Sequence, residues 1–485
     1  MEGEAPISER FWIRIPLYIR TMLLVLFNKL TNRIAALEAE VAALKAAFEK
    51  LNQNSTNSSY PSSKDKPDVK RARPRKKGVR KKGAQKGHKK HDRPLVPPEK
   101  VNQTVPCKPT NCECCGDPIE GEDPNYEPFQ VAEIPPVEPH VTEYQLHSLP
   151  CESCGHSSKG RLPDGIGPGH FGPRLVCVLS LLTGMCRLSK RSIKRLLSEV
   201  FGLAISTGQI CRLQSKMADA LDPCVEEAKA YVRTKPTNID ETTWKEKRKT
   251  VRLWVAATPW VVLFLIRPTR GAIVLKEIIG PDYEYVVTSD RAKAYETLPA
   301  KLRQLCWAHL DRDFQAMVDR NNRGSPVGKR LMNQVDELFA KWGKVRDGTW
   351  SRATFYRHTA SLRADFLAAF EFGRKCGCAK TAATCRELLK WKDSLWTFAK
   401  VEGVEPTNNG GEREIRHPVE YRKMCFGTDS EQGSKFVGNI MTVTATLRRQ
   451  GRDVLEFLVA CYTAYINGVE PPSLLPSADA TDRDG

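Results

Sequence analysis

Three acidic segments, widely separated along the chain, constrain its folding more than any other feature. Asp240 lies in Thr-Asn-Ile-Asp-Glu-Thr-Thr-Trp, Asp290 in Val-Val-Thr-Ser-Asp-Arg, and Glu412 in Pro-Thr-Asn-Asn-Gly-Gly-Glu-Arg. In-line displacement at a phosphodiester is helped by two divalent ions, which stabilise the attacking and leaving oxygens and are held by carboxylates from separate elements. The pattern therefore predicts that these three carboxylates meet in one site that binds magnesium or manganese.

The sequence around these acids predicts an α/β core. Residues 251–258 and 260–267 have the pattern of two strands separated by a turn, and 285–288 form a short strand ending on Ser289-Asp290. Successive strands carrying such carboxylates fit, partly by analogy, the ribonuclease-H-like sheet of polynucleotidyl transferases. The long interval between Asp290 and Glu412 is helical in pattern from 329 to about 398, which predicts an inserted helical domain.

Four further residues are predicted to support this site. Cys306 and His309 form a Cys-x-x-His pair, and because no second pair has suitable spacing, a packing or supporting role is favoured over zinc binding. Asn409 or Thr407 is expected to cap the helix that carries Glu412. Arg413, directly after Glu412, is expected to meet backbone phosphates.

The charge of the chain indicates a polyanionic partner. Its 485 residues carry a formal net charge of +19, which favours double-stranded DNA over a basic protein with a merely solvated surface. The apolar stretch from Phe11 to Phe27 is interrupted by Arg14, Pro16 and Arg20. A span needs about 18 or more apolar residues, so we expect no membrane segment and a cytoplasmic, nucleoid-associated protein.

A heptad repeat near the start predicts homodimerisation. Leucine recurs every seventh residue and apolar residues fill the other core position; the two series are Leu30, Leu37, Leu44, Leu51 and Phe27, Ile34, Val41, Phe48. The alternative is one amphipathic helix packed on its own domain. The Lys-, Arg- and Gly-rich sequence that follows is expected to be a disordered linker that contacts phosphates, or else one that only solubilises the chain.

Two cysteine knuckles predict a structural zinc site. Cys112 and Cys115 form one Cys-x-x-Cys pair, Cys151 and Cys154 form another, and a glycine follows each. Four thiolates make a closed tetrahedral site that leaves no position for a catalytic water. Cys107 and Cys114 leave the ligand register open.

A helix-turn-helix outline follows the knuckles. A serine-capped helix in 188–200, a turn at Phe201-Gly202-Leu203 and a second helix from Ser206 fit this motif, although a plain helical pair has the same pattern. The residues predicted to contact DNA are Lys190, Arg191, Lys194, Arg195, Thr207, Gln209, Arg212 and Gln214.

In order along the chain, these segments resemble the insertion-sequence-66 family of bacterial transposases. The similarity is carried by Asp240-Glu-Thr-Thr-Trp, Ser289-Asp290, Cys306-Trp-Ala-His309, Pro406 to Arg413, Arg422-Lys423 and Phe426-Gly-Thr-Asp-Ser430. It implies an Asp-Asp-Glu transposase, with Asp240, Asp290 and Glu412 as the triad, acting with magnesium on transposon ends and target DNA. Gly410-Gly411 departs from the family pattern, in which alanine more often precedes the glutamate.

The expected architecture is therefore multidomain α/β. Its parts are a lead-in helix and coiled coil (1–52), a basic linker (53–105), a zinc-binding ribbon (106–160), a helix-turn-helix-like region (161–234), a ribonuclease-H-like core (235–315 and 401–470) interrupted by a helical insertion (316–400), and a disordered tail (471–485). Two rival functions are a dimeric DNA-binding regulator with an inactive nuclease core and a structure-specific nuclease that never joins strands.

Overall fold

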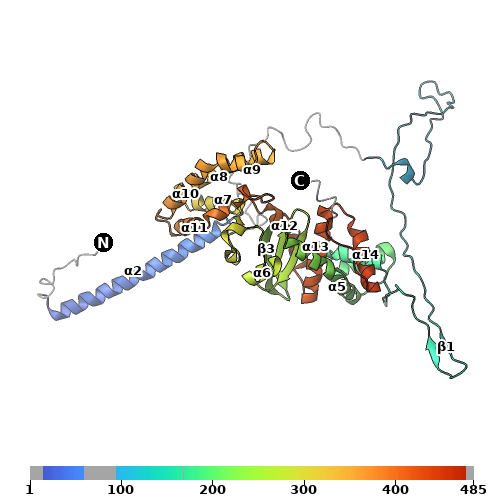
Figure 1. Ribbon diagram of the computed structural model, residues 1–485, viewed down its shortest axis with the longest axis horizontal. Helices are drawn as coiled ribbons and strands as arrows, with labels where there is room; N and C mark the ends of the chain where they lie inside the picture. The colour runs from blue at the N-terminus through green and yellow to red at the C-terminus, as the bar shows by residue number, and fades with distance from the viewer. Residues whose placement is uncertain (1–14, 59–93, 168, 477–485) are drawn as a thin grey trace. The chain divides into compact units, whose positions relative to one another are not determined.

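The computed structural model describes residues 15–58, 94–167 and 169–476 (Figure 1). Most of the predicted linker, including Arg71 to Lys77 and Arg80 to Lys82, lies outside the described residues, as does most of the predicted tail. The chain divides into two compact units: residues 73–166 with 188–212 form one, and residues 1–72, 167–187 and 213–485 form the other. We describe each by itself.

The larger unit is built on a mixed five-stranded sheet. Its strands are β3 (Thr237–Glu246), β4 (Lys249–Ala257), β5 (Val262–Arg267), β6 (Val287–Ser289) and β7 (Arg303–Leu305), in the spatial order β5-β4-β3-β6-β7. The first three are antiparallel neighbours, whereas β6 and β7 are parallel to β3. The strands expected at 251–258 and 260–267 are thus observed as β4 and β5. The length of β3 was not apparent from the sequence, because polar residues occupy much of it.

Helix α13 (Glu431–Arg449) covers the outer edge of β5. The hydroxyl oxygens of Thr442 and Thr446 accept hydrogen bonds from the backbone N–H groups of Phe264 and Val262, at 2.9 and 3.1 Å. An unpaired strand edge would otherwise offer its donors to another chain. Gly438 allows the close approach, because a Cβ there would lie 3.2 Å from the carbonyl oxygen of Phe264.

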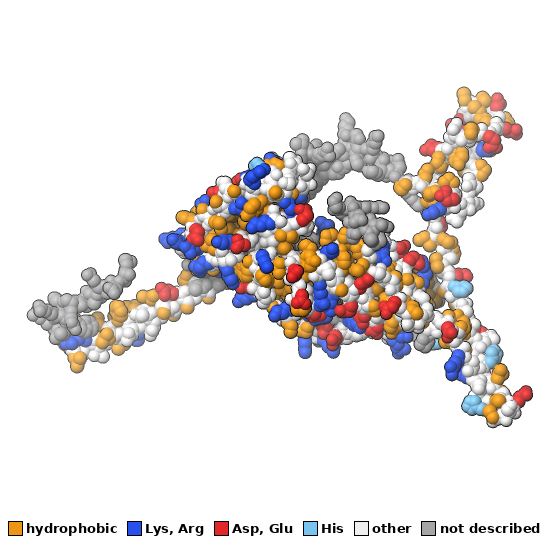
Figure 2. Space-filling view, viewed as in Figure 1, with side chains coloured by type: hydrophobic (Ala, Val, Ile, Leu, Met, Phe, Trp, Pro, Cys, Tyr) orange, Lys and Arg blue, Asp and Glu red, His pale blue; other side chains and the backbone are white. Residues whose placement is uncertain are grey.

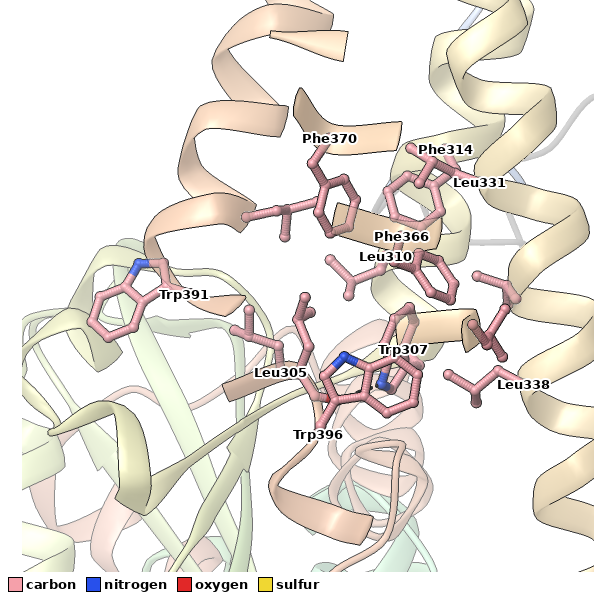
Figure 3. Packing of buried hydrophobic residues seen from close by; sticks show 14 of the residues in the cluster. Leu305, Trp307, Leu310, Phe314, Leu331, Leu338, Phe366, Phe370, Trp391 and Trp396 are labelled. Carbon is pink, nitrogen blue, oxygen red and sulfur yellow. Dashed lines mark hydrogen bonds between the residues drawn. The ribbon is translucent and has the colours of Figure 1, made fainter. Parts of the chain in front are cut away.

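Five helices between β7 and the last part of the unit form a helical insertion. They are α7 (Trp307–Asp319), α8 (Ser325–Arg346), α9 (Arg352–His358), α10 (Ala360–Gly373) and α11 (Ala379–Lys390). Their core is rich in aromatic rings that point toward one another, including Trp307, Phe366 and Trp396 (Figure 3). The ring centroids of Trp307 and Phe366 are 4.9 Å apart, which is the range of favourable aromatic contacts. Most of α7 falls in the segment predicted to be core (235–315), but in the structure its apolar side chains belong to the core of the insertion.

The remaining helices of this unit flank the sheet or precede it. They are α3 (Pro173–Gly184), most of α5 (Thr207–Val232), α6 (Ala272–Ile279), α12 (Asn409–Cys425) and α14 (Val454–Asn467). The N-terminal helix α2 (Leu17–Leu51) contains the predicted heptads, and their apolar side chains are exposed along it (Figure 2). Within 15–58, 94–167 and 169–476, no helix is both long and apolar enough to cross a membrane.

The smaller unit contains little regular structure apart from α4 (Lys190–Phe201). A two-stranded antiparallel hairpin, β1 (Ser148–Pro150) with β2 (Ser157–Lys159), surrounds the second cysteine knuckle. Helix α4 begins as predicted, because the Ser189 hydroxyl accepts a hydrogen bond from the Ser192 backbone N–H at 3.1 Å. It ends at Gly202 in the left-handed conformation, which glycine adopts without steric cost.

Candidate active site

The register of the parallel strands brings Asp240 and Asp290 to neighbouring positions. Asn238 on β3 pairs with Thr288 on β6, and each aspartate lies two residues further along its own segment. Ser289 pairs with Leu305 on β7, so Cys306 follows at the same end of the sheet. The Cys306 backbone N–H donates to the carbonyl oxygen of Ser289 at 2.9 Å. Three segments distant in sequence therefore end side by side.

A buried asparagine attaches the helix that carries Glu412 to this end of the sheet. The side-chain amide of Asn408 donates to the carbonyl oxygen of Ile239 at 3.0 Å, and its backbone N–H donates to Cys306 Sγ at 3.1 Å. The Trp307 backbone N–H donates to the carbonyl oxygen of Pro406 at 2.9 Å. Glu412, in the first turn of α12, is thereby placed next to β3 and the start of α7.

The expectation that Asn409 or Thr407 caps this helix is wrong. Asn408 is the first flanking residue of α12, and its side chain makes no capping bond because it reaches β3 instead. The glycines before Glu412 have a steric role here. A Cβ on Gly410 would collide with the amide nitrogen of Asn238, and one on Gly411 would lie 2.9 Å from Asn408 Oδ1. Glycine thus lets α12 approach the sheet closely.

The three carboxylates share one electrostatic environment. Burial raises the pKa of Asp240 well above its usual range, and the nearby charges of Glu241, Asp290 and Glu412 raise it further. Like charges that cannot be solvated disfavour the ionised form. The structure therefore places Asp290 and Glu412 close enough to Asp240 to disfavour its ionised form.

Sequence reasoning missed a fourth carboxylate, Glu241. Its side chain is only 1% exposed, forms an ion pair with Arg270, and accepts a hydrogen bond from the Tyr295 hydroxyl at 2.8 Å. Burial raises its pKa, and so does the charge of Asp290. Arg270 also lies 3.3 Å from Asp290 Oδ2 and links the two acids. The only sequence signal was the position of Glu241 next to Asp240; nothing in the spacing marked Arg270 or Tyr295.

A second group of residues surrounds Glu412. Cys306, His309 and Glu412 offer ligand atoms within 4.8 Å of one another, and among the described residues this is the one such cluster of three or more. Arg312 Nη2 donates to Glu412 Oε1 at 3.0 Å, while His309 Nδ1 lies 3.3 Å from the same oxygen without forming a hydrogen bond. Burial and the charge of Arg312 lower the pKa of His309, which favours a neutral ring.

The other predicted supporting residues are placed differently. Cys306 is buried, and burial raises the pKa of its thiol to about 12, so it is a neutral thiol in the absence of a metal. Asn409 and Arg413 are exposed on α12. The sequence pattern favours Asn409, but the residue that contacts Cys306 is its neighbour Asn408.

Comparison with protein-family models identifies the family of this chain. The model of the Transposase IS66 family matches residues 187–436, just over half of the chain and all of the residues that form the acidic site. The chain belongs to the IS66 transposase family.

Two other comparisons cover parts of this transposase-family chain. Residues 18–94 match a family of unknown function, DUF6444. An uncharacterized protein, y4qI, of Sinorhizobium fredii (strain NBRC 101917 / NGR234) is 27% identical over 248 residues, which are 45% of this chain and 45% of that protein. The chain thus spans about half the length of the curated relative it matches.

The two cysteine knuckles of the IS66-family chain are each formed in the same way. The Gly116 and Gly155 backbone N–H groups donate to the carbonyl oxygens of Cys112 and Cys151, at 2.9 and 2.8 Å, and both glycines have positive φ. Backbone N–H groups within each knuckle lower the pKa of Cys112 and of Cys151. This favours the thiolate form that metals bind. The thiols of Cys112, Cys115, Cys151 and Cys154 do not form a four-sulfur cluster in the described chain.

Six of the eight predicted DNA-contact residues are exposed, whereas the two glutamines are engaged within the protein. Lys190, Arg191, Lys194 and Arg195 are exposed on α4, and Thr207 and Arg212 are exposed near the start of α5. The Gln209 side chain accepts a hydrogen bond from the Ser206 backbone N–H at 3.1 Å, which completes a cap. Gln214 is buried, and its amide donates to the Thr183 hydroxyl at 2.7 Å, so the structure does not present it to a ligand.

Proposed function

We propose that this IS66-family chain is a DNA transposase that binds the ends of its element, cleaves the DNA there by metal-dependent hydrolysis, and joins the freed 3′ hydroxyl to target DNA. The observation that carries the proposal is the convergence of Asp240, Asp290 and Glu412 from three separated segments, with the pKa of Asp240 raised by burial and by neighbouring negative charges that include the other two. Carboxylates gathered this way from separate elements are the ligands that a two-metal phosphoryl-transfer site requires.

The donor set fits magnesium or manganese, which prefer oxygen ligands. Asp240 is buried among acids that raise its pKa, and a divalent cation would offset that repulsion. Asp240, Asp290 and Glu412 would hold the ions, while Arg270 contacts only one oxygen of Asp290. When bound, such ions supply Lewis-acid stabilisation of the attacking and leaving oxygens.

The protein's own groups orient the carboxylates and the DNA. Arg312 fixes one oxygen of Glu412, and the rigid attachment of α12 through Asn408 keeps that carboxylate near Asp240. Arg413 and Arg416 are exposed along the same helix, where their guanidinium groups can contact backbone phosphates. Lys and Arg side chains are scattered over the face drawn in Figure 2, which suits sequence-independent attraction to DNA.

The proposed fold of the core is ribonuclease-H-like. It is supported by three antiparallel strands followed by two parallel ones, in the order β5-β4-β3-β6-β7, with Asp240 on the central strand and Asp290 directly after β6. The helical insertion enters after β7 and returns at α12. The insertion therefore lies between Asp290 and Glu412, the second and third of the proposed metal ligands.

The other segments are proposed to recognise DNA and to dimerise. Each cysteine knuckle provides a preformed half of a zinc site, through Cys112 and Cys115 and through Cys151 and Cys154, and the basic face of α4 is available to a DNA groove. The heptad side chains of α2 are exposed in one chain, so a second copy would bury them as a homodimer. Sedimentation of a protein lacking residues 1–52 tests this: an unchanged mass would contradict dimerisation through α2.

The function is tested with purified full-length protein and labelled DNA carrying the two ends of the host element, with and without magnesium. We expect metal-dependent cleavage that leaves a 3′ hydroxyl and disappears in Asp290→Asn, with end-binding retained. Asp282→Asn is the matched control, since Asp282 is an exposed aspartate in the turn before β6. Cleavage that persists in Asp290→Asn would refute the assignment of the site.

Two outcomes would favour the rival functions. End-specific binding by the wild-type protein without cleavage indicates a regulator with an inactive core. Cleavage of branched DNA irrespective of its terminal sequence, without strand joining, indicates a structure-specific nuclease.

A further inference from the structure

Phe426 combines two unfavourable features in the free protein. It follows the last residue of α12 in the left-handed conformation, with φ of 60°, and its side chain is 82% exposed. A bulky residue with positive φ is a genuine outlier, and such residues persist where the surroundings enforce them, often at ligand-binding positions. Glycine at this position would remove both the strain and the exposed ring, so the free fold gains nothing from phenylalanine.

Contacts with the β3–β4 hairpin hold the two residues that follow Phe426 in place. The Thr428 backbone N–H donates to the carbonyl oxygen of Lys245, and the Lys247 N–H donates to that of Thr428, both at 2.9 Å. Gly427, which lies between Phe426 and Thr428 in the sequence, is so close to the Lys245 backbone that a Cβ on it could not be accommodated. The Trp244 indole N–H donates to the Thr428 hydroxyl at 3.1 Å. The exposed ring therefore stands on a rigid support.

The hairpin turn that contacts this support carries positive charge. Lys247 and Arg248 both have positive φ and form the turn itself, and Lys245 and Lys249 flank it. All four side chains are exposed. An exposed aromatic ring beside a group of cations is the combination that binds nucleic acid with unstacked bases, because the cations meet phosphates and the ring meets a base.

Helix α12 connects this surface to the acidic site. Glu412 lies in its first turn and Phe426 directly follows its last residue. At 1.5 Å per residue the two positions are about 20 Å apart along the helix, which corresponds to about six base pairs of DNA. Arg413, Arg416 and Lys423 are exposed along the interval. A DNA duplex that follows α12 from the acidic site would reach Phe426.

We propose that Phe426, with the basic turn at Lys247 and Arg248, is a DNA-binding site in which the ring stacks on a base displaced from the duplex about six base pairs from the cleavage position. The proposal rests on the proposed function in two respects, namely that this chain binds DNA and that the cleavage position lies at the acidic site. The partner is DNA rather than a protein because four exposed cations lie on the hairpin turn that contacts the two residues after Phe426. Every base has an aromatic face, so the contact does not depend on base identity.

The test compares the binding of full-length protein to two probes, a DNA duplex with a single-base bulge and the same duplex fully paired, by fluorescence anisotropy. We expect the wild-type protein to prefer the bulged duplex, and Phe426→Ala to lose about tenfold in affinity for it, with little change for the paired duplex. Phe426→Trp should keep the preference. Phe372→Ala is the matched control, because Phe372 is an exposed phenylalanine on α10, in ordinary helical conformation.

A second variant separates folding from binding. Phe426→Gly should lose the preference for the bulged duplex while raising the midpoint of thermal unfolding, since glycine relieves the positive φ. If Phe426→Ala binds both probes as the wild type does, the stacking proposal is overturned. It is equally overturned if Phe426→Ala alters only the sedimentation mass, which would indicate a contact between protein chains.

The experiment also distinguishes failure of this site from failure of the proposed function. Metal-dependent cleavage of element ends, combined with no preference for the bulged duplex, overturns the stacking site and supports the transposase. A Phe426-dependent preference without any cleavage supports the stacking site and counts against the transposase.

Discussion

The helical insertion and the acidic end of the sheet are built on opposite principles. In the insertion, tryptophan, phenylalanine and leucine side chains are removed from water, and the aromatic rings pack against one another. At the acidic end, four carboxylates lie near one another, and burial together with neighbouring negative charges raises the pKa of Asp240 and of Glu241. The first region gains free energy from burial, whereas the second stores repulsion that a bound cation would relieve.

Helix α7 joins these two regions. Trp307, Leu310 and Phe314 recur at helical spacing and enter the apolar core. His309 and Arg312, on a different side of the same helix, contact Glu412. The insertion is therefore a scaffold for the acidic site, because its stability determines where these two side chains lie.

The largest effect is expected from removing one charge at the acidic end. Asp240→Asn should reduce cleavage by about 10⁴-fold, as loss of a central catalytic group does in other hydrolases, and should also stabilise the metal-free protein at neutral pH. The pKa of Asp240 is raised in the folded state, so the unfolded chain releases this proton first as pH rises. The protein then loses stability as the pH rises from the pKa of Asp240 in the unfolded chain to its pKa in the folded state.

Thermal unfolding in metal-free buffer at several pH values checks this prediction. The midpoint of Asp240→Asn should exceed that of the wild type increasingly as pH rises from the acid side. If magnesium binds at the acidic site, adding it should raise the wild-type midpoint more than that of the variant, because a ligand that binds only the folded state stabilises it. An Asp240→Asn protein that is less stable than the wild type at neutral pH would contradict the stored repulsion.

The next largest effect is expected in the apolar region. Trp307→Ala should lower the free energy of unfolding by about 3–5 kcal/mol, since Trp307 is fully buried and its indole N–H donates to the Leu395 carbonyl oxygen. Urea denaturation measures the change, and Phe372→Ala, at an exposed site, should shift it little. If α7 is the scaffold for the acidic site, Trp307→Ala should also reduce cleavage at temperatures where the protein remains folded.

A smaller effect on stability is expected at the start of α12, where Gly410 packs closely against the sheet. Gly410→Ala should destabilise the protein by about 1–3 kcal/mol, because the new methyl group would press on the Asn238 amide. It should also reduce cleavage by displacing Glu412. Gly403→Ala probes a nearby glycine with open space around it but positive φ, so its cost is strain alone and cleavage by the folded protein should be retained. Equal loss of cleavage in both variants would show that close packing at Gly410 is unimportant.

The fold was predictable where the pattern is local. Strands β4 and β5 were evident from runs of β-branched and aromatic residues, and Ser189 was evident as a helix cap. Strand β3 was hidden because Asp240, Glu241 and the two threonines after them interrupt its apolar pattern. A strand placed at a site carries the polar residues that the site needs, and this weakens the very signal by which strands are recognised.

What the sequence by itself determined is the set of chemical groups: three acidic segments, two cysteine knuckles, a heptad helix and a basic charge, with the family to which they belong. The tertiary structure alone decided that Asn408 anchors α12, that Glu241 joins the acids, and that Phe426 is exposed beside a basic turn. Each of these depends on contacts between segments distant in sequence. Local propensity and spacing carry no record of such contacts, because they arise only when strand register and helix packing are fixed.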